Sequence, residues 1–218
     1  MIETNKIFLT DNSIAIDFIR KYKYPYEVLS DLKEYVIKLG KSLSNEYEEV
    51  EENIWIHKSA KVFPTAYIIA PCIIDEGAEV RHCAFVRGSV IIGKNSVIGN
   101  SCEIKNSILF DNVQVPHFNY IGDSILGFKA HMGAGSITSN VKSDKSNVCI
   151  KANDNKYETN RKKVGAFLGD SVEIGCNCVL NPGTIVGAYS SIYPLTSVRG
   201  VIAKSSIVKS MDNIIERK

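Results

Sequence analysis

Residues 86–108 read VRGSVIIGKNSVIGNSCEIKNSI, and this stretch decides the fold. An aliphatic residue recurs every six positions, at Val86, Ile92, Ile98 and Ile104. A period of six does not mark one face of a helix, because successive positions rotate around the helix axis by about 100° per residue. It fits the alternation of a β-strand only if the chain bends after each hexad, since a straight strand through many hexads would be far too long.

The same ladder of aliphatic residues extends in both directions. A small or aliphatic side chain stands four places after each of its first eight members, from Ala66 to Ile108. Three hexads close a triangular coil, and stacked coils bury the ladder in one long core. The pattern therefore predicts a mainly β fold, a parallel β-helix of roughly six to seven coils. The ladder positions are Val62, Ile68, Ile74, Val80, Val86, Ile92, Ile98 and Ile104, then Leu109, Val115, Ile121, Leu126 and Met132 after a slip of one residue, and finally Leu168, Ile174, Leu180, Val186, Ile192 and Val198.

The ladder also divides the chain into segments. We expect an N-terminal helical segment and linker at residues 1–53, a β-helix at 54–205 with an inserted loop at about 141–164, and a C-terminal tail at 206–218. Asp11 or Ser13 is suited to begin a short helix, and residues 25–39 have one apolar helical face that Gly40 would end. The acidic stretch at 46–52 is typical of a solvated linker. The tail, ending SMDNIIERK, is expected to cover the open end of the coil as a short helix or strand.

Composition excludes several classes of partner. The 218 residues carry a formal net charge of +2, so no global field favours nucleic acid or a membrane. No apolar run reaches the roughly 18 residues of a membrane span, and the N-terminus lacks the pattern of a signal peptide. Six cysteines without a CxxC spacing are typical of small core residues in a reducing compartment. We therefore expect a cytoplasmic protein without disulfides or a zinc site.

Three motifs interrupt the ladder with polar residues: PHFNYIGDS (116–124), GAGSITSN (133–140) and GAFLGDSVEIG (165–175). In this order and spacing they resemble the C-terminal, left-handed β-helical acetyltransferase domain of the bifunctional sugar-1-phosphate nucleotidylyltransferase/acetyltransferases. Those enzymes make UDP-N-acetylglucosamine in bacteria and related sugar nucleotides in archaea. The resemblance covers about residues 55–205, and it alone implies the left hand of the coil, since ordinary β-crossovers are right-handed.

The resemblance implies that His117 is the general base of an acetyl-CoA-dependent N-acetyltransferase. Acetyl transfer to an amino sugar needs a neutral amine, so a group must accept the proton as nitrogen attacks the thioester. A histidine is suited to this role near neutral pH. Without the flanking motif, His117 would be read as an exposed histidine with no role.

The resemblance also places a set of acceptor-binding residues. Arg87 and Lys105 fall on the family's positions for the sugar phosphate, where cations with fixed donors are needed. Tyr120 matches a tyrosine that contacts the sugar, Asn140 matches an asparagine that binds substrate, and Lys145 is the best match for a lysine beyond it. The implied acceptor is an amino-sugar phosphate, glucosamine-1-phosphate first and galactosamine-1-phosphate next.

The acetyl donor in this family lies along the coil of a neighbouring subunit, which implies a homotrimer with acetyl-CoA as cosubstrate and no metal requirement. Ala134 matches a backbone contact to the donor, and its N–H would help to stabilise the thioester oxyanion. Cys176 stands where the bacterial enzymes carry a serine. His131 replaces an asparagine that contacts the sugar, so we expect a different acceptor specificity.

Two other functions fit the sequence less well. A β-helical carbonic anhydrase needs histidines about five residues apart, whereas the closest pair among His57, His82, His117 and His131 is fourteen apart. A noncatalytic trimeric scaffold or regulatory subunit in sugar-nucleotide metabolism would need the ladder but not the polar motifs. No Gly-rich nucleotide-binding start precedes the β-helix, so no nucleotidylyltransferase activity is expected from these residues.

Overall fold

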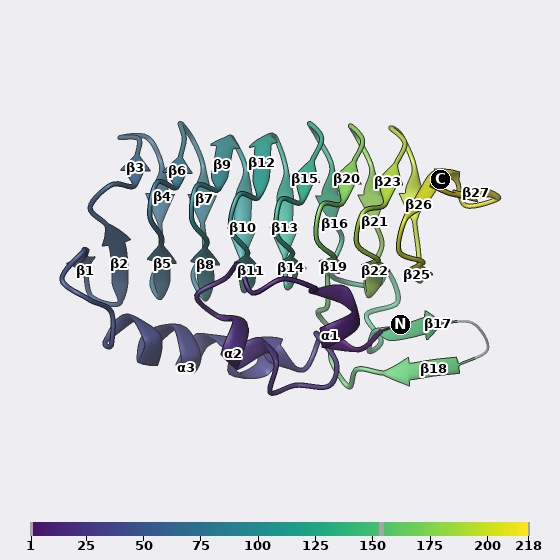
Figure 1. Ribbon diagram of the computed structural model, residues 1–218, viewed down its shortest axis with the longest axis horizontal. Helices are drawn as coiled ribbons and strands as arrows, with labels where there is room; N and C mark the ends of the chain where they lie inside the picture. The colour runs from purple at the N-terminus through teal and green to yellow at the C-terminus, as the bar shows by residue number, and fades with distance from the viewer. Residues whose placement is uncertain (1, 153–154, 218) are drawn as a thin grey trace.

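The computed structural model describes residues 2–152 and 155–217, and they form a parallel β-helix (Figure 1). The chain passes through three sheets in turn, and each strand pairs in parallel with the strand one coil later. Ile74, for example, lies opposite Ile92, which lies opposite Leu109. The coil makes about eight turns. This is more than the six to seven predicted, in part because the chain continues coiling into the expected tail.

The three sheets are named A, B and C and are described from the N-terminal end. Sheet A consists of β1 (Tyr47–Glu51), β2 (Ile54–His57), β5 (Cys72–Ile74), β8 (Val90–Ile92), β11 (Ser107–Leu109), β14 (Ile125–Leu126), β19 (Ala166–Leu168), β22 (Thr184–Val186) and β25 (Val201–Ile202). Sheet B consists of β3 (Lys61–Val62), β6 (Glu79–Val80), β9 (Val97–Asn100), β12 (Gln114–His117), β15 (His131–Met132), β20 (Glu173–Ile174), β23 (Ser191–Ile192), β26 (Ser206–Ser210) and β27 (Asn213–Glu216). Sheet C consists of β4 (Tyr67–Ile68), β7 (Phe85–Val86), β10 (Glu103–Lys105), β13 (Tyr120–Gly122), β16 (Ile137–Thr138), β21 (Val179–Leu180) and β24 (Ser197–Val198).

The ladder residues fill the interior as predicted, with exceptions at two places. Ladder members from Ile74 to Val198 are at most 3% exposed. Val62 is 36% exposed and Ile68 is only partly buried, because both lie in the first turn, where no earlier coil covers them. Ile108 stands four places after Ile104, and the register places it opposite Ile91 on the outer side of sheet A, so the one-residue slip occurs before it.

The bends between strands are made by residues with positive φ. Most are asparagine, serine or glycine, such as Asn95 and Asn177 at φ of 54°. These residue types tolerate the left-handed region better than others do. Phe118 (φ 52°) and Leu195 (φ 61°) are bulky exceptions, and their side chains are 62% and 79% exposed. Both lie on the corner that joins sheet B to sheet C.

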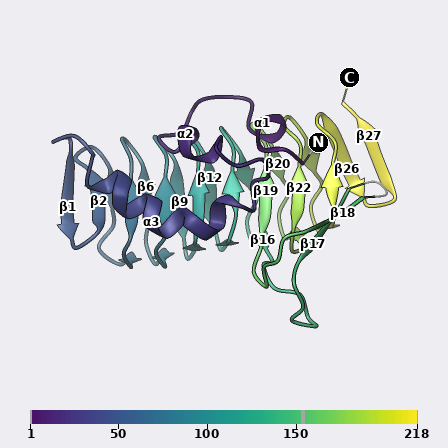
Figure 2. The same cartoon turned by 90° about the horizontal axis from the view of Figure 1, so that it is seen from below.

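The outer face of sheet A is covered by the N-terminal segment (Figures 1 and 2). The segment contains helices α1 (Thr4–Ile7), α2 (Ile16–Ile19) and α3 (Val28–Gly40), and α3 packs on β5 and β8. The predicted short helix is α2, and the predicted longer helix is α3, which includes Gly40 as its last residue. α1 was not predicted. Outward-facing residues of sheet A are consequently fully buried; they are Ile73, Ile91, Ile108, Ile125 and Phe167.

Two contacts hold the N-terminal segment at opposite ends of the face that it covers. At one end, the buried carboxylate of Asp170 accepts hydrogen bonds from the N–H groups of Leu9 and Thr10, both at 2.9 Å. At the other end, Gly40 packs against the indole of Trp55 so closely that a Cβ atom would lie 2.1 Å from the ring. A residue with a side chain therefore does not fit at position 40 without a shift of the helix.

The segment predicted as an inserted loop, residues 141–164, carries secondary structure of its own. β17 (Cys149–Ala152) and β18 (Asn155–Glu158) pair in antiparallel register, and Val141 bridges Lys163 where the segment leaves and rejoins the coil. We call β17 and β18 the hairpin; residues 153 and 154 lie outside the described part. Contacts between β17 and β25 place the hairpin against the last turns of the β-helix.

Both ends of the β-helix carry an antiparallel strand. The acidic stretch expected as a linker instead forms β1, which pairs with β2 and is largely exposed. The expected tail continues the coil as β26 and then returns as β27, which is the strand alternative of the prediction. Residue 218 lies outside the described part. No helix of the described chain is long and apolar enough to cross a membrane.

Candidate functional site

Lys105 and Asn140, two predicted acceptor-binding residues, converge on the carboxylate of Asp123. Lys105 Nζ lies 2.9 Å and Asn140 Nδ2 2.5 Å from Asp123 Oδ2, and Asn106 Nδ2 lies 2.8 Å from Oδ1. These residues follow successive strands of sheet C, so the coil stacks them along the corner between sheets C and A. Asp123 is 3% exposed, and a carboxylate buried to this extent needs such donors. We call Lys105, Asn106, Asp123 and Asn140 the Asp123 cluster.

Tyr120 adjoins this cluster from strand β13. Its hydroxyl lies 3.2 Å from Asn140 Nδ2, which donates the hydrogen bond. Burial, reinforced by the negative charge of Asp123, raises the pKa of Tyr120 above its ordinary value. The phenol therefore stays protonated near neutral pH and keeps its own O–H as a donor for a ligand.

Arg87 lies one coil before Lys105 and is paired with an acid. Its Nη1 is 2.6 Å from Glu103 Oε1, and the guanidinium carbon lies 5.8 Å from the centre of the Phe85 ring. The hydrogen bond to Glu103 raises the pKa of Arg87. Both predicted phosphate ligands are therefore already partnered by carboxylates. Arg87 is the more accessible of the two, since its side chain is 43% exposed and that of Lys105 is 18% exposed.

His117, Ala134 and Cys176 occupy equivalent places on three successive coils, on the corner between sheets B and C. The Gly135 N–H donates to the His117 carbonyl at 3.0 Å, and the Asn177 N–H donates to the Ala134 carbonyl at 2.8 Å. The predicted base and the two predicted donor-binding residues therefore form one column, which we call the B–C column. His117 and Cys176 are exposed, and the His117 ring makes no hydrogen bond within the described part of the chain.

Asn119 ties His117 to the turn that contains Ala134. The amide of Asn119 is 2% exposed; its Oδ1 accepts from the His117 N–H at 3.1 Å, and its Nδ2 donates to the Gly133 and Ser136 carbonyls at 2.8 and 3.0 Å. The side chain thus fixes the backbone of the predicted base against the next coil. Asn119, Asp123 and Glu103 were not among the predicted site residues. The only signal for the first two was their place inside PHFNYIGDS.

The B–C column and the Asp123 cluster lie at opposite ends of the strands of sheet C. The column is on the corner with sheet B, and the cluster is on the corner with sheet A. Tyr120 follows His117 by three residues, so their Cα atoms are at most about 10 Å apart at the usual rise per residue of a strand. Sheet C therefore forms the floor between a histidine at one corner and a polar cluster at the other. An acceptor molecule held at the cluster and extended along this floor would bring its far end toward His117.

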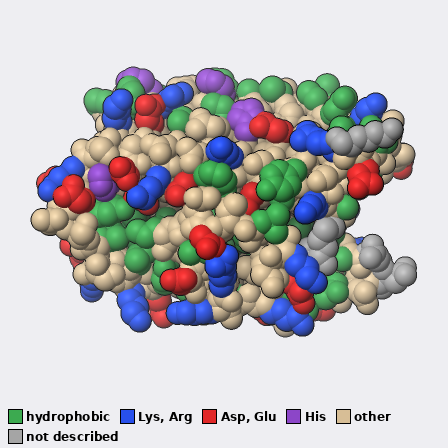
Figure 3. All heavy atoms as spheres, in the orientation of Figure 1, with side chains coloured by type: hydrophobic (Ala, Val, Ile, Leu, Met, Phe, Trp, Pro, Cys, Tyr) green, Lys and Arg blue, Asp and Glu red, His purple; other side chains and the backbone are tan. Residues whose placement is uncertain are grey.

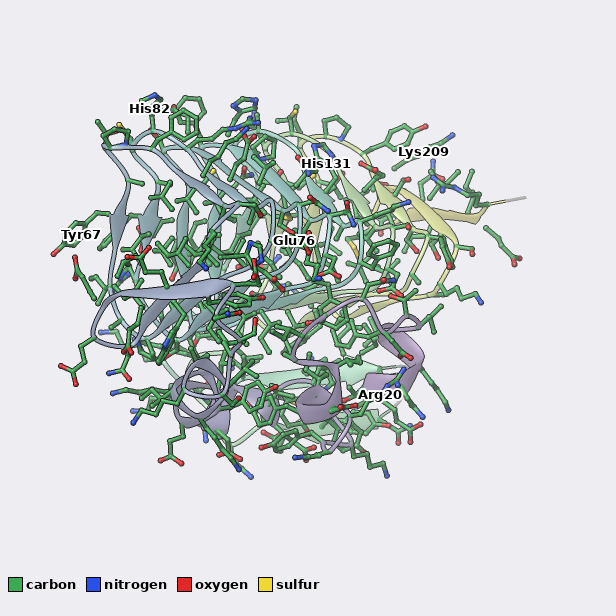
Figure 4. All side chains as sticks on the ribbon, turned by 60° about the vertical axis from the view of Figure 1, so that its left-hand side comes forward. Arg20, Tyr67, Glu76, His82, His131 and Lys209 are labelled. Carbon is green, nitrogen blue, oxygen red and sulfur yellow. The ribbon has the colours of Figure 1, made fainter. Side chains whose placement is uncertain are left out.

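The last two predicted acceptor-binding residues lie elsewhere in this chain. His131 is on sheet B, where its Nδ1 lies 2.9 Å from Glu173 Oε2, and Figure 4 shows it on the same side of the molecule as His82. Lys145 is exposed in a turn of the inserted segment, where its N–H donates to the Lys142 carbonyl at 3.0 Å. Neither joins the Asp123 cluster within one chain, and their roles stay predictions.

The face shown in Figure 3 carries histidine side chains along its upper edge, near the corner between sheets B and C. Over residues 2–152 and 155–217, no group of three or more His, Cys, Asp or Glu side chains has the arrangement of a metal site.

Comparisons with known proteins place these features in a family context. A family model described as the GMPPB C-terminal domain matches residues 68–202. A bifunctional GlmU protein of Methanococcus maripaludis is 32% identical over 198 residues, which cover 89% of this chain and 48% of the relative. A bifunctional sugar-1-phosphate nucleotidylyltransferase/acetyltransferase of Sulfurisphaera tokodaii is 31% identical over 146 residues, 67% of this chain and 36% of the relative. The chain spans about half the length of the GlmU relatives that it matches.

Among solved structures, a mutant of perosamine N-acetyltransferase from Caulobacter crescentus, in complex with CoA and GDP-perosamine, is similar in fold. The match has a TM-score of 0.34 and 17% sequence identity, and it covers 73% of this chain and 54% of that protein.

Proposed function

Since this chain belongs to the family of hexapeptide-repeat C-terminal domains found in GlmU-like nucleotidylyltransferase/acetyltransferases, we propose that it transfers the acetyl group of acetyl-CoA to the amine of an amino-sugar phosphate. The observation that carries the proposal is the convergence of Lys105, Tyr120 and Asn140 around Asp123, at the other end of the sheet C strands from the corner that carries His117. A scaffold needs the buried ladder, but it does not need a polar cluster built from three coils.

The acceptor's phosphate would bind beside Arg87 and Lys105. Their carboxylate partners leave donors free, because an ammonium has three N–H groups and a guanidinium has five, and each uses one in the bond described above. The sugar would extend along sheet C past the hydroxyl of Tyr120. We take glucosamine-1-phosphate as the first candidate and galactosamine-1-phosphate as the second, and His131 would alter the preference between amino sugars.

In the reaction, His117 would accept a proton from the acceptor amine as its nitrogen attacks the acetyl carbonyl. The C–S bond to CoA then breaks, and the leaving thiolate takes up the proton from His117 to become the free thiol. Transfer is direct, because the acetyl group passes to the amine without a covalent bond to the protein. The donor would lie along the B–C column beside Ala134 and Cys176, with the Ala134 N–H directed at the developing oxyanion. His131 and Lys145 do not reach the Asp123 cluster of their own chain, so we propose a homotrimer in which they act at a neighbour's site.

The test is thiol release from acetyl-CoA with glucosamine, its 1- and 6-phosphates and galactosamine-1-phosphate. A phosphorylated amino sugar should have a much higher kcat/KM than the bare sugar, and Arg87→Ala should remove most of that gain. His117→Ala should fold normally and lose about 10²–10⁴-fold in turnover, the usual contribution of a positioned base. Equal activity on bare glucosamine would refute the phosphate assignment. Binding of acetyl-CoA without turnover on any amine would instead favour the regulatory alternative.

A further inference from the structure

The inserted segment at 141–164 carries a charge opposite to that of the rest of the chain. It contains seven Lys and Arg against three Asp and Glu, a net charge of +4. The remaining residues hold 19 cationic and 21 anionic side chains, a net charge of −2. A charge asymmetry of this kind in a nearly neutral chain indicates an anionic partner for the basic part.

Part of this charge lines a hollow where the inserted segment meets the last turns of the β-helix. The hollow has a volume of about 210 Å³ and lies between β17 and the corner that joins sheet C to sheet A. Its cations are Lys142 and Lys151 from the inserted segment and Arg199 from the coil, and Cys149, Ile150 and Pro182 give it apolar walls. No Asp or Glu is among the described residues that line it.

The cations differ in how firmly they are held. Arg199 Nη2 donates to Asn181 Oδ1 at 3.1 Å, and Asn181 is itself fixed by bonds to the Val198 carbonyl and the Ser197 hydroxyl at 2.8 and 2.9 Å. Lys142 makes an exposed ion pair with Asp144 at 3.3 Å, which a stronger anion can replace at little cost. Lys151 has no acidic partner among the residues that the structure describes.

Glycines allow the inserted segment to sit close to the coil and preform the hollow. Gly183 and Gly200 both have φ of 79°, and a Cβ atom at these positions would lie 3.0 Å from Ile150 Cγ1 and 3.2 Å from the Lys151 carbonyl oxygen. The hairpin carboxylate, Glu158, lies opposite Cys149 in the register and is hydrogen-bonded to the Cys149 thiol, and it also lines a second hollow. Among the described residues, Lys151 and Arg199 have no carboxylate partner, and the carboxylate that pairs with Lys142, Asp144, is exposed.

We propose that this hollow, lined by Lys142, Lys151 and Arg199, is a binding site for the phosphate group of an organic phosphate, separate from the Asp123 cluster. It lies on the same corner between sheets C and A as Asn140, beside the next two turns of the coil. Those turns carry Asn181 and Arg199. Lysine and arginine donors suit a phosphate, and apolar walls suit the organic part that carries it. The inference does not depend on the acetyltransferase proposal, because it rests on other residues and is tested by binding.

The experiment is calorimetric titration of the whole chain with pyrophosphate at low ionic strength. Lys151→Ala and Arg199→Ala should each weaken binding by about tenfold, the usual effect of one charge-assisted hydrogen bond. Lys156→Ala is the matched control, since Lys156 lies opposite Lys151 in the hairpin but does not line the hollow, and it should change affinity little. Thermal unfolding of each variant separates lost binding from lost folding.

Arg87→Ala is titrated as a fourth variant. Three results would overturn the site: no binding of pyrophosphate, an equal loss in Lys151→Ala, Arg199→Ala and Lys156→Ala, or a loss only in Arg87→Ala. The first shows that the hollow does not bind phosphate, the second indicates diffuse attraction to a basic surface, and the third moves the anion to the predicted acceptor site. Titrations with CoA and with a sugar nucleotide then identify the source of the phosphate. The ligand whose affinity falls in Arg199→Ala but not in Lys156→Ala is the one that occupies the hollow.

Discussion

Replacing Asp123 by asparagine tests whether the Asp123 cluster is held together by its buried charge. The carboxylate accepts three hydrogen bonds, one of them from the ammonium of Lys105. An asparagine keeps one acceptor oxygen and turns an NH₂ group toward one of the present donors. It also leaves Lys105, whose side chain is only 18% exposed, without a counterion.

The loss can be estimated from these contacts. A hydrogen bond to a charged group contributes about 1.5–3 kcal/mol, and breaking a buried ion pair by removing one partner costs about 3–5 kcal/mol. Because Lys105 keeps some contact with water and one acceptor remains, we expect Asp123→Asn to lower the free energy of unfolding by about 2–4 kcal/mol. In the enzyme assay it should raise KM for the acceptor more than it lowers kcat, because the proposed role of the cluster is to bind the acceptor and not to react with it.

Urea unfolding, followed by far-UV circular dichroism at one fixed protein concentration, measures the change in stability. Fixing the concentration matters, because assembly contributes to apparent stability by mass action. Glu76→Gln is the control: it removes the exposed carboxylate that pairs with Lys94 at 2.9 Å and should leave the unfolding curve nearly unchanged. An Asp123→Asn curve that coincides with the Glu76→Gln curve would show that the buried charge does not organise the cluster.

Three further predictions follow from burial and packing. Iodoacetamide at about pH 8, near the ordinary thiol pKa, should modify the exposed Cys83 and Cys176 and leave Cys72 unmodified. The reason is that burial raises the pKa of the Cys72 thiol to about 12. Peptide mass mapping measures the modification, and reaction of Cys72 in the folded protein would refute the prediction. Gly40→Ala should destabilise the chain by about 1–3 kcal/mol through its clash with Trp55, which a lowered midpoint of thermal unfolding would report. Light scattering should give the mass of three chains, and a monomer at micromolar concentration would contradict the shared site.

The hexad ladder was sufficient to predict the β-helix, because a period of six constrains every coil in the same way. Its limits appeared where a residue's surroundings come from another segment. Ile91 and Ile108 lie on the outer side of sheet A, and their burial depends on a helical segment far away in the sequence. An outward isoleucine next to an inward one signals that both faces of a strand are covered, but the covering element cannot be read from it.

Only some of the residues that meet at the candidate site were predicted from the sequence, for a similar reason. Motif resemblance predicted acceptor-binding roles for Lys105, Tyr120 and Asn140, which stay predictions, and the fold brings these residues together around one carboxylate. The carboxylate itself, Asp123, was missed because an Asp beside a turn glycine is ordinary turn chemistry. The acid partner of Arg87 was missed because strand pairing across coils, not sequence spacing, brings Glu103 beside it.

The N-terminal segment contacts the β-helix at two points, Asp170 and Trp55, and these two contacts fix the number of coils between them. Repeat proteins commonly gain or lose whole repeats in evolution, since each repeat contacts only its neighbours. Here the N-terminal segment contacts both Trp55 in β2 and Asp170 just after β19. An added or deleted coil between these two residues would change their separation by about 4.8 Å, so the segment could no longer make both contacts. Variation in coil number should therefore concentrate beyond Asp170, in the turns that also carry the basic hollow.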